Sequence, residues 1–254
     1  MAKNKMKVVR TKSPSAIASE WDAIAPVRER QISSGADISY NFILIPTVLR
    51  LCQGADTTSV VDVGCGVGIL TKQIAVVARE VLGIDPSPKS IELAGGLCAS
   101  LKNVRYANES IEAHARRLNS PLYTLAIANM TLIVTPNLGK VLDAVHKILV
   151  PGGILVVTLA HPCFWPQYWG YLSSKWFDYS KELLIEAPFK ISGEGTDYIT
   201  THIHRPLEMY FDTLLKSGFE VVQAVEPMPN KNVASKYSSS WKYPRFLGIK
   251  CLRK

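Results

Sequence analysis

The stretch Val60-Val61-Asp62-Val63-Gly64-Cys65-Gly66-Val67-Gly68 decides the fold class of this 254-residue chain. An apolar run ends in alternate glycines, and a helical pattern follows at residues 69–78. Glycine accepts positive φ and has no Cβ, so a ligand can approach such a turn closely. The next helix offers free N–H groups to a carboxylate or phosphate. The stretch therefore predicts an α/β fold with a ligand site at the strand end. A tight strand–helix turn without a ligand is the alternative.

Two acidic residues near this turn indicate the kind of ligand. The spacing is G-x-G-x-G with Ile69 next, so the dinucleotide fingerprint G-x-G-x-x-G is not met. Asp62 precedes the first glycine by two residues, which suits a ligand with a cationic amine better than a pyrophosphate. Asp85 ends the next apolar run, where a carboxylate can accept hydrogen bonds from both ribose hydroxyls. Its alternative role is to cap the helix that begins at Ser87.

The rest of the chain alternates apolar runs with helical patterns, which predicts parallel strands joined by right-handed crossovers. After residue 160 the sequence becomes rich in aromatics, and two late strands predict an antiparallel hairpin at the sheet edge. We expect a basic flexible segment at 1–14 and one domain over 15–254, with a helical cover at 15–55 and a substrate lid at 161–205. The predicted strands are 59–63, 80–85, 104–107, 122–128, 154–159, 219–225 and 245–252.

The net charge of +8 comes from the two ends of the chain. Residues 1–12 and 227–254 hold basic side chains and no acids, whereas residues 13–226 hold 17 basic and 21 acidic residues. We therefore expect a solubilising tail and a solvated last strand rather than a nucleic-acid site. The odd count of five cysteines, none in a C-x-x-C pair, favours a reducing cytoplasm. Without a long apolar run or a secretory signal, a membrane location is not expected.

The chain resembles the class I S-adenosylmethionine-dependent methyltransferases, strongest over residues 59–160. The HPCF and HRPL pieces at 161–164 and 204–207 resemble a bacterial small-molecule subgroup less specifically. The resemblance implies a Rossmann-like α/β sheet of order 3-2-1-4-5-7-6 with strand 7 antiparallel. The segments that carry it are VVDVGCGVGILT (60–71), VLGIDPSPKSIELA (81–94), LAIANMTL (125–132) and ILVPGGILVVT (148–158).

The resemblance also implies a cofactor, S-adenosyl-L-methionine, which leaves as S-adenosyl-L-homocysteine. Gly64, Cys65 and Gly66 would wrap its methionyl part, with Asp62 near its ammonium and Asp85 on its ribose. Ser110 stands where relatives carry the acid that binds the adenine amine, so that side-chain bond is in doubt. A backbone N–H of Ile111 would still reach the adenine. The remaining expected cofactor residues are Gly68, Pro86 and Asn129.

Methyl transfer requires an acceptor held in line with the methyl–sulfur bond, exclusion of water and, for a hydroxyl acceptor, a base. His161, which closes a strand, is the first candidate base, with a hydrogen-bonded loop histidine as its alternative. His204 is the second candidate, and Arg205 is expected to contact the substrate. No third ligand accompanies the histidines, so no metal is expected. The predicted acceptor wall, which could also be a local core, comprises Tyr40, Phe164, Trp165, Trp169 and Trp176.

Three functions remain open on the sequence alone. The first is O-, N- or C-methylation of a small apolar or aromatic molecule, favoured by the aromatic segment and the non-basic body of the chain. The second is methylation of RNA or protein, favoured only by the basic ends. The third is a non-methylating protein on the same fold, for instance a cyclase. A homodimer is also expected.

Overall fold

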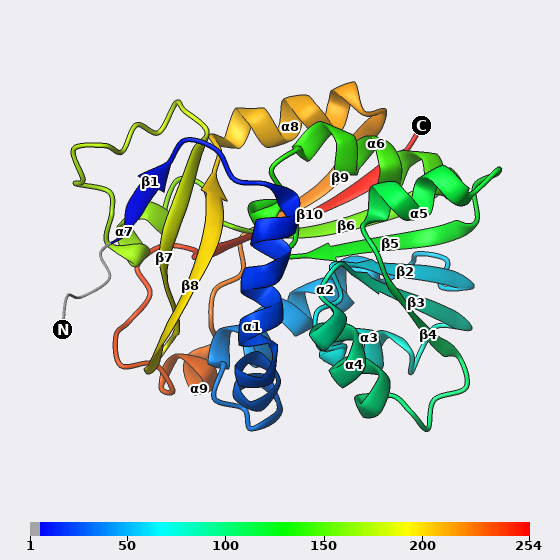
Figure 1. Ribbon diagram of the computed structural model, residues 1–254, viewed down its shortest axis with the longest axis horizontal. Helices are drawn as coiled ribbons and strands as arrows, with labels where there is room; N and C mark the ends of the chain where they lie inside the picture. Colours follow the sequence, from blue (N-terminus) through cyan, green and yellow to red (C-terminus); the bar gives the residue numbers. More distant parts are fainter. Residues whose placement is uncertain (1–5) are drawn as a thin grey trace.

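A seven-stranded sheet forms the centre of the structure, a computed structural model that describes residues 6–254 (Figure 1). Its order is β4-β3-β2-β5-β6-β10-β9, and β10 is antiparallel to both neighbours. The predicted sheet order and antiparallel late hairpin are therefore confirmed. The strands are β2 (Ser59–Val63), β3 (Glu80–Asp85), β4 (Val104–Asn108), β5 (Tyr123–Asn129), β6 (Leu149–Ala160), β9 (Phe219–Val225) and β10 (Phe246–Arg253).

Helices cover both faces of this sheet because its central strands are apolar on both sides. Val60 and Leu125 pack in one core cluster and Val61 and Ala126 in another, so neighbouring residues of one strand face opposite layers. In Figure 1, α5, α6 and α8 lie on one side of the sheet and α2, α3 and α4 on the other. Their bounds are α2 (Ile45–Cys52), α3 (Ile69–Ile74), α4 (Pro88–Leu97), α5 (Ile111–Arg117), α6 (Leu138–Ile148) and α8 (Leu207–Lys216).

A second, three-stranded sheet stands beside the first, which the sequence did not predict. Its order is β1-β7-β8, all antiparallel, with bounds β1 (Lys7–Val9), β7 (Leu183–Ile191) and β8 (Glu194–His204). The predicted lid is thus largely a hairpin, preceded by the short helix α7 (Trp165–Trp169). The expectation of a flexible segment at 1–14 is wrong for Lys7–Val9, because these residues pair with β7. Residues 1–5 lie outside the described part.

Helix α1 (Pro14–Ser33) crosses between the two sheets and confirms the helical cover (Figure 1). The Ser13 hydroxyl caps it by accepting a hydrogen bond from the Ala16 N–H. Toward the seven-stranded sheet, Asp22 Oδ1 accepts hydrogen bonds from the Ser87 hydroxyl and the Lys89 N–H at the start of α4, at 2.7 and 2.8 Å. Toward the three-stranded sheet, Glu20 Oε2 accepts a hydrogen bond from the Thr201 N–H of β8 at 2.9 Å. Side-chain contacts therefore fix α1 to both layers.

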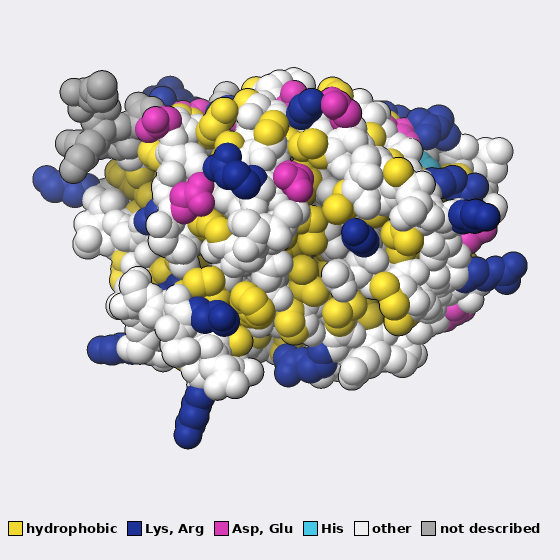
Figure 2. Space-filling model, turned by 90° about the horizontal axis from the view of Figure 1, so that it is seen from below, with side chains coloured by type: hydrophobic (Ala, Val, Ile, Leu, Met, Phe, Trp, Pro, Cys, Tyr) yellow, Lys and Arg dark blue, Asp and Glu magenta, His cyan; other side chains and the backbone are white. Residues whose placement is uncertain are grey.

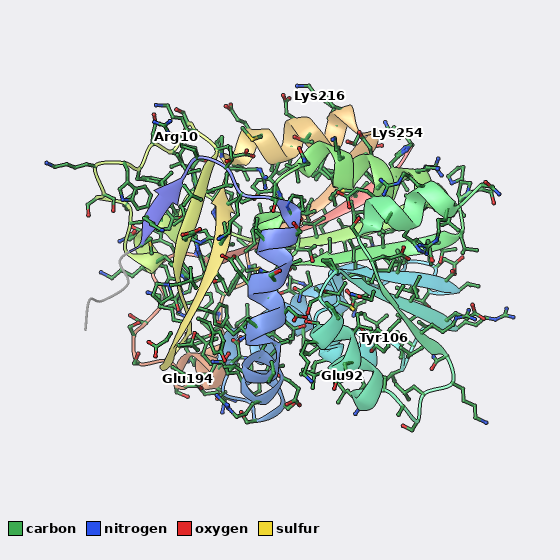
Figure 3. All side chains as sticks on the ribbon, in the orientation of Figure 1. Arg10, Glu92, Tyr106, Glu194, Lys216 and Lys254 are labelled. Atoms are coloured by element: carbon green, nitrogen blue, oxygen red, sulfur yellow. The ribbon has the colours of Figure 1, made fainter. Side chains whose placement is uncertain are left out.

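Shorter helical segments complete the chain. A π-helical turn (Tyr40–Leu44) leads into α2, a 3-10 turn (Leu132–Val134) follows β5, and α9 spans Lys231–Ala234. At the tip of the β7–β8 hairpin, Glu194 (labelled in Figure 3) accepts hydrogen bonds from Arg30 and Gln31 near the end of α1. Within residues 6–254, no helix has both the length and the apolar character that crossing a membrane requires.

Candidate functional site

A cavity of about 700 Å³ opens at the carboxyl ends of β2, β3 and β5. Its walls come from the glycine loop, α1, α7 and the β7–β8 hairpin. This is where open α/β sheets bind ligands, because loops diverge there from the strand ends. The volume falls in the range of small-molecule sites. The second sheet thus supplies one wall of a cavity whose opposite wall the parallel sheet supplies.

The three glycines of the loop all have positive φ but meet different surroundings. A Cβ on Gly64 would lie 2.6 Å from the Thr131 side chain, and one on Gly68 would lie 2.6 Å from the Tyr106 hydroxyl (Figure 3 labels Tyr106). A Cβ on Gly66 would meet no protein atom within 4 Å. Gly64, Cys65 and Gly66 line the cavity, whereas Gly68 does not. Gly68 therefore serves the packing of the turn, and Gly66 leaves space in the cavity.

Asp85 links the glycine loop to the start of α4. Its two carboxylate oxygens accept hydrogen bonds from the Gly66 N–H at 2.9 Å and the Ser87 N–H at 2.8 Å. Burial raises the pKa of Asp85, and the two backbone donors oppose that shift. Asp85 and Pro86 both line the cavity. The carboxylate can accept further hydrogen bonds there, because each oxygen has more than one lone pair.

Asp62 is fully buried behind the loop and does not itself line the cavity. It accepts a hydrogen bond from the Thr71 hydroxyl at 2.6 Å. Burial raises the pKa of Asp62 to about 7, with Thr71 opposing the shift. Its negative charge in turn raises the pKa of Tyr40, a cavity residue whose pKa rises chiefly through burial. A cation bound in the cavity near Tyr40 would therefore favour the charged form of Asp62.

The remaining predicted cofactor residues lie together at the strand ends. Ser110 and Ile111 line the cavity, and the Ser110 hydroxyl caps α5 by accepting a hydrogen bond from the Ala113 N–H. Asn129 lines it too and accepts a hydrogen bond from the Thr158 hydroxyl. The next residue, Met130, has φ of 60°, which is uncommon for a residue other than glycine and tends to mark functional sites. No signal in the sequence indicated this conformation.

The predicted acceptor wall is only partly at the cavity. Tyr40, Trp165 and Trp169 line it. Phe164 and Trp176 do not: Phe164 stacks on Tyr243 with ring centroids 5.0 Å apart, and Trp176 stacks on Tyr171 at 5.6 Å. The aromatic segment therefore provides both a wall of the cavity and a small core behind it, as the two alternatives for this segment allowed.

The two predicted catalytic histidines do not line the cavity. His161 is buried, and its Nε2 lies 2.8 Å from a carboxylate oxygen of Glu226. His204 Nε2 lies 3.0 Å from the Tyr179 carbonyl oxygen, which accepts its hydrogen bond. The structure thus places both in hydrogen-bonded positions outside the site, and their catalytic roles stay predictions.

Arg205 connects β8 to the segment that follows β5. Its fully buried guanidinium donates hydrogen bonds to the carbonyl oxygens of Leu132, Thr135 and Pro136 and forms an ion pair with Glu182. Arg205 does not line the cavity, so its predicted contact with substrate has no direct route in this structure. Arg205 instead joins the end of β8, in the second sheet, to the segment that follows β5, in the parallel sheet.

Sequence reasoning missed several residues that line the cavity. Arg28 forms an ion pair with Asp37 at 2.9 Å and lies over the Phe189 ring at 4.8 Å. His202 also lines the cavity, whereas His204, two residues later in β8, does not. The alternation His202-Ile203-His204 is the sequence signal that could have indicated His202. Within residues 6–254, no three His, Cys, Asp or Glu side chains converge as metal ligands would.

Comparisons with known proteins relate the chain to methyltransferases. The family described as "Methyltransferase domain" matches residues 38–224. A ubiquinone biosynthesis O-methyltransferase from Pectobacterium atrosepticum is 33% identical over 107 residues, which are 42% of this chain and 44% of the relative. The match therefore spans less than half the length of that curated relative.

Solved structures share the fold at low sequence identity. The 1,6-didemethyltoxoflavin-N1-methyltransferase of Burkholderia thailandensis, solved with bound 1,6-didemethyltoxoflavin and S-adenosylhomocysteine, has a TM-score of 0.59 at 15% identity. The match covers 100% of this chain and 98% of that one. The [4+2]-cyclase SpnF has a TM-score of 0.64 at 14% identity and covers 97% of it. These structures show the fold, and the family match covers well over half of the sequence. The chain therefore belongs to the methyltransferase domain family.

Proposed function

We propose that this protein transfers a methyl group from S-adenosyl-L-methionine to a small, apolar or aromatic acceptor. One observation carries the proposal: a single cavity joins the open Gly66 position and Asp85 to an aromatic wall that includes Trp165 and Trp169. A ligand at the glycine loop and a second one at the aromatic wall would therefore share one enclosed space. Proximity of this kind is the main requirement of a transfer between two bound molecules.

The residues at the glycine loop suit the three parts of this cofactor. The space at Gly66 and the backbone of Gly64 and Cys65 would accommodate the methionyl chain, with Asp62 behind them as the opposite charge for its ammonium. Asp85 would accept the ribose hydroxyls, and Ile111 would offer its N–H beside the adenine. When bound, the cofactor supplies an electrophilic methyl group on a sulfonium. The chain binds the cofactor and the acceptor, orients them toward each other and excludes water.

The aromatic side of the cavity favours a small acceptor over a macromolecule. Aromatic walls from α1, α7 and β7 enclose it, and Trp21 and Phe189 meet edge to face at 5.8 Å. On the face shown in Figure 2, Lys and Arg side chains are scattered, mostly toward the rim, around a band of hydrophobic side chains. Nucleic-acid binding needs basic side chains gathered along one surface, so RNA methylation is not favoured.

The first experiment is calorimetric titration with S-adenosylmethionine and S-adenosylhomocysteine, followed by turnover assays against aromatic hydroxyl, amine and carbon acceptors. We expect micromolar binding of both and release of S-adenosylhomocysteine with an acceptor present. Folded protein that binds neither would overturn the proposal. Binding without turnover on any acceptor would instead favour a non-methylating function on this fold.

Two wider expectations belong to the same proposal. All five cysteines are free thiols, which supports a reducing, cytoplasmic location. The expected homodimer is tested by light scattering on the purified chain, where a mass near 28 kDa would identify a monomer instead.

A further inference from the structure

Three side chains that line the cavity carry buried nitrogens without a hydrogen-bond partner. Among residues 6–254, five buried side-chain nitrogens have no hydrogen-bond partner: Nε1 of Trp21, Trp165 and Trp241, and both ring nitrogens of His202. All of these side chains except Trp241 line the cavity. Folded proteins rarely leave such atoms unpaired, because each one costs about 1–3 kcal/mol. Their presence along the cavity lining points to a ligand that supplies the partners.

His202 differs from the two indoles in what it can accept. An indole N–H can only donate a hydrogen bond, whereas a neutral imidazole offers one N–H and one lone pair. Burial, assisted by the nearby His204, lowers the pKa of His202 to about 3, so the ring is neutral at physiological pH. His202 is therefore the one member of this group that can receive a proton donor of the ligand.

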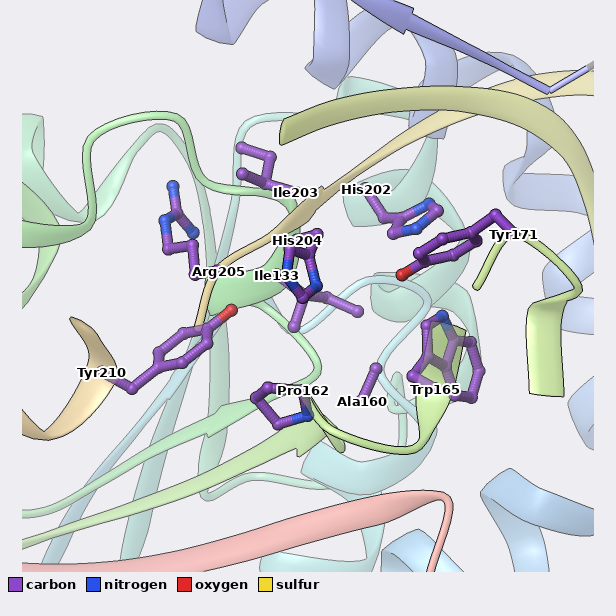
Figure 4. Close-up of a pocket in the computed structure, with 10 residues that line it drawn as sticks. All are labelled: Ile133, Ala160, Pro162, Trp165, Tyr171, His202, Ile203, His204, Arg205 and Tyr210. Atoms are coloured by element: carbon purple, nitrogen blue, oxygen red, sulfur yellow. The ribbon is translucent and has the colours of Figure 1, made fainter. Parts of the chain in front are cut away.

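The surroundings of His202 favour a flat ligand. Its ring meets Trp169 edge to face with centroids 4.5 Å apart, and Tyr171 lies at 5.7 Å. Figure 4 shows His202 beside Tyr171, with Arg205 and Tyr210 on the other side of the strand. Both ring nitrogens are fully buried. For a ligand in the cavity to reach them, the imidazole must turn about its Cβ–Cγ bond, a torsion with a broad distribution.

Resting on the proposed function, we propose that His202 binds the hydroxyl group of a hydroxylated aromatic acceptor and so selects it for O-methylation. The hydroxyl donates to the His202 lone pair, and the indole N–H groups of Trp165 and Trp21 donate to a further oxygen on the same molecule. The aromatic ring of the acceptor packs against Trp169 and Phe189. The acceptor class is therefore a planar compound with one free hydroxyl and at least one other oxygen.

Methyl transfer to this hydroxyl forms one bond, breaks another and releases one proton. The hydroxyl oxygen forms a bond to the methyl carbon while the carbon–sulfur bond breaks, and the sulfur leaves as a neutral thioether. The oxygen, now strongly acidic, gives its proton to the His202 nitrogen, from which it passes to solvent. Because His202 is a weak base, it orients the hydroxyl before transfer and receives the proton only as the new bond forms.

The test compares two probes that differ by one hydroxyl, hydroquinone monomethyl ether and hydroquinone dimethyl ether. Each is titrated by ligand-observed NMR into the protein saturated with S-adenosylhomocysteine. We expect the monomethyl ether to bind about fivefold to tenfold more tightly, as one hydrogen bond allows. His202→Phe should remove this preference and leave the affinity for S-adenosylhomocysteine unchanged. His202→Asn, which keeps an acceptor, should restore part of it, and His146→Phe on α6 is the matched control.

Thermal unfolding gives a readout that is independent of the probes. Phe replaces an unpartnered imidazole by a ring of similar shape among aromatic neighbours, so the Tm of His202→Phe should equal or exceed that of the wild type. Equal binding of both probes, an undiminished preference in His202→Phe, or no binding of either probe up to its solubility limit would each overturn the assignment. Failure of S-adenosylhomocysteine itself to bind would overturn the proposed function instead.

Discussion

At the residue scale, Gly66 differs from the other two glycines of the loop in the space around it. Gly64 and Gly68 have no room for a Cβ because Thr131 and Tyr106 lie in the way. Gly66 has room, so the protein alone does not require glycine there except for its φ of +53°. What a Cβ at Gly66 would fill is the cavity.

Gly66→Ala should weaken binding of S-adenosylhomocysteine at least tenfold, because the new methyl group occupies ligand space. It should also lower stability by about 1 kcal/mol through its positive φ. Gly152→Ala is the matched control, since Gly152 has φ of +77°, open surroundings and a place in β6 outside the cavity lining. Calorimetry and thermal unfolding should show the same loss of stability in both variants, but lost affinity only in Gly66→Ala. Equal affinities would remove Gly66 from the site.

We expect Asp62 to make ligand binding depend on pH. With a pKa of about 7 in the free protein, this carboxyl is protonated below pH 7, and a bound ammonium favours its ionised form. The affinity for S-adenosylhomocysteine should therefore rise as pH increases toward 7, by up to tenfold per pH unit, and level off above it. Asp62→Asn should flatten this profile. A wild-type affinity that does not change between pH 5 and 8 would contradict the role of Asp62.

The same group has the opposite effect on the unliganded fold. Between the pKa of an unfolded aspartate, near 3.8, and about 7, the native state holds a proton that the unfolded state has released. The contribution of Asp62 to the free energy of unfolding therefore falls as pH rises through this window. Asp62→Asn should remove that part of the pH dependence in denaturant melts.

At the scale of elements, the two walls of the cavity depend on side chains that join them. Asp22 and Glu20 tie α1 to α4 and β8, respectively. Arg205 ties the end of β8 to the turn after β5 through three carbonyl oxygens. These contacts replace the backbone pairing that two strands of one sheet would have, because β8 and β5 belong to different sheets.

Arg205→Met should therefore destabilise the protein by about 3 kcal/mol or more, because it leaves buried carbonyl oxygens without donors. For a chain of this size that corresponds to a Tm lower by roughly 6–12 °C. Lys216→Ala, which removes an exposed ion pair with Asp212 on α8, should leave the Tm within error. A normal Tm for Arg205→Met, together with lost acceptor binding, would return Arg205 to its predicted role at the substrate.

At the scale of the whole molecule, one cavity lies between the two sheets. Lys12 contributes to this arrangement by pairing with Glu186 of β7 at 2.6 Å and with Glu20 of α1. We expect a ligand that contacts walls from both sheets to stabilise their docked arrangement.

S-adenosylhomocysteine at a hundred times its Kd should raise the free energy of unfolding by about 2.7 kcal/mol. The Tm should then rise by roughly 5–11 °C in differential scanning fluorimetry. Adenosine alone, which lacks the amino-acid part, should give a smaller shift at equal concentration. The absence of any shift with S-adenosylhomocysteine would show that the compound does not bind the native state.

Much of this molecule could be predicted from local sequence patterns. The parallel strands, the glycine turn and the antiparallel late hairpin follow from apolar runs and turn residues, which act over short distances. The place of Gly66 and Asp85 at the cavity could be predicted for the same reason, since both lie where apolar runs end. Parallel strands bring those ends to one edge of the sheet whatever the rest of the chain does.

The second sheet and the acceptor side were decided only by tertiary structure. The pairing of Lys7–Val9 with Leu184–Glu186 of β7 joins segments far apart in the sequence, and no local pattern encodes such a contact. The β7–β8 turn at Ser192-Gly193, with Gly193 at φ of +98°, was the one local signal that could have revealed the hairpin. Once the hairpin forms, its path past the cavity places the His202 side chain on the cavity wall. The same path brings Arg205 to the turn after β5. Which histidine faces a ligand therefore depends on how two sheets dock, and docking is set by the packing of distant residues.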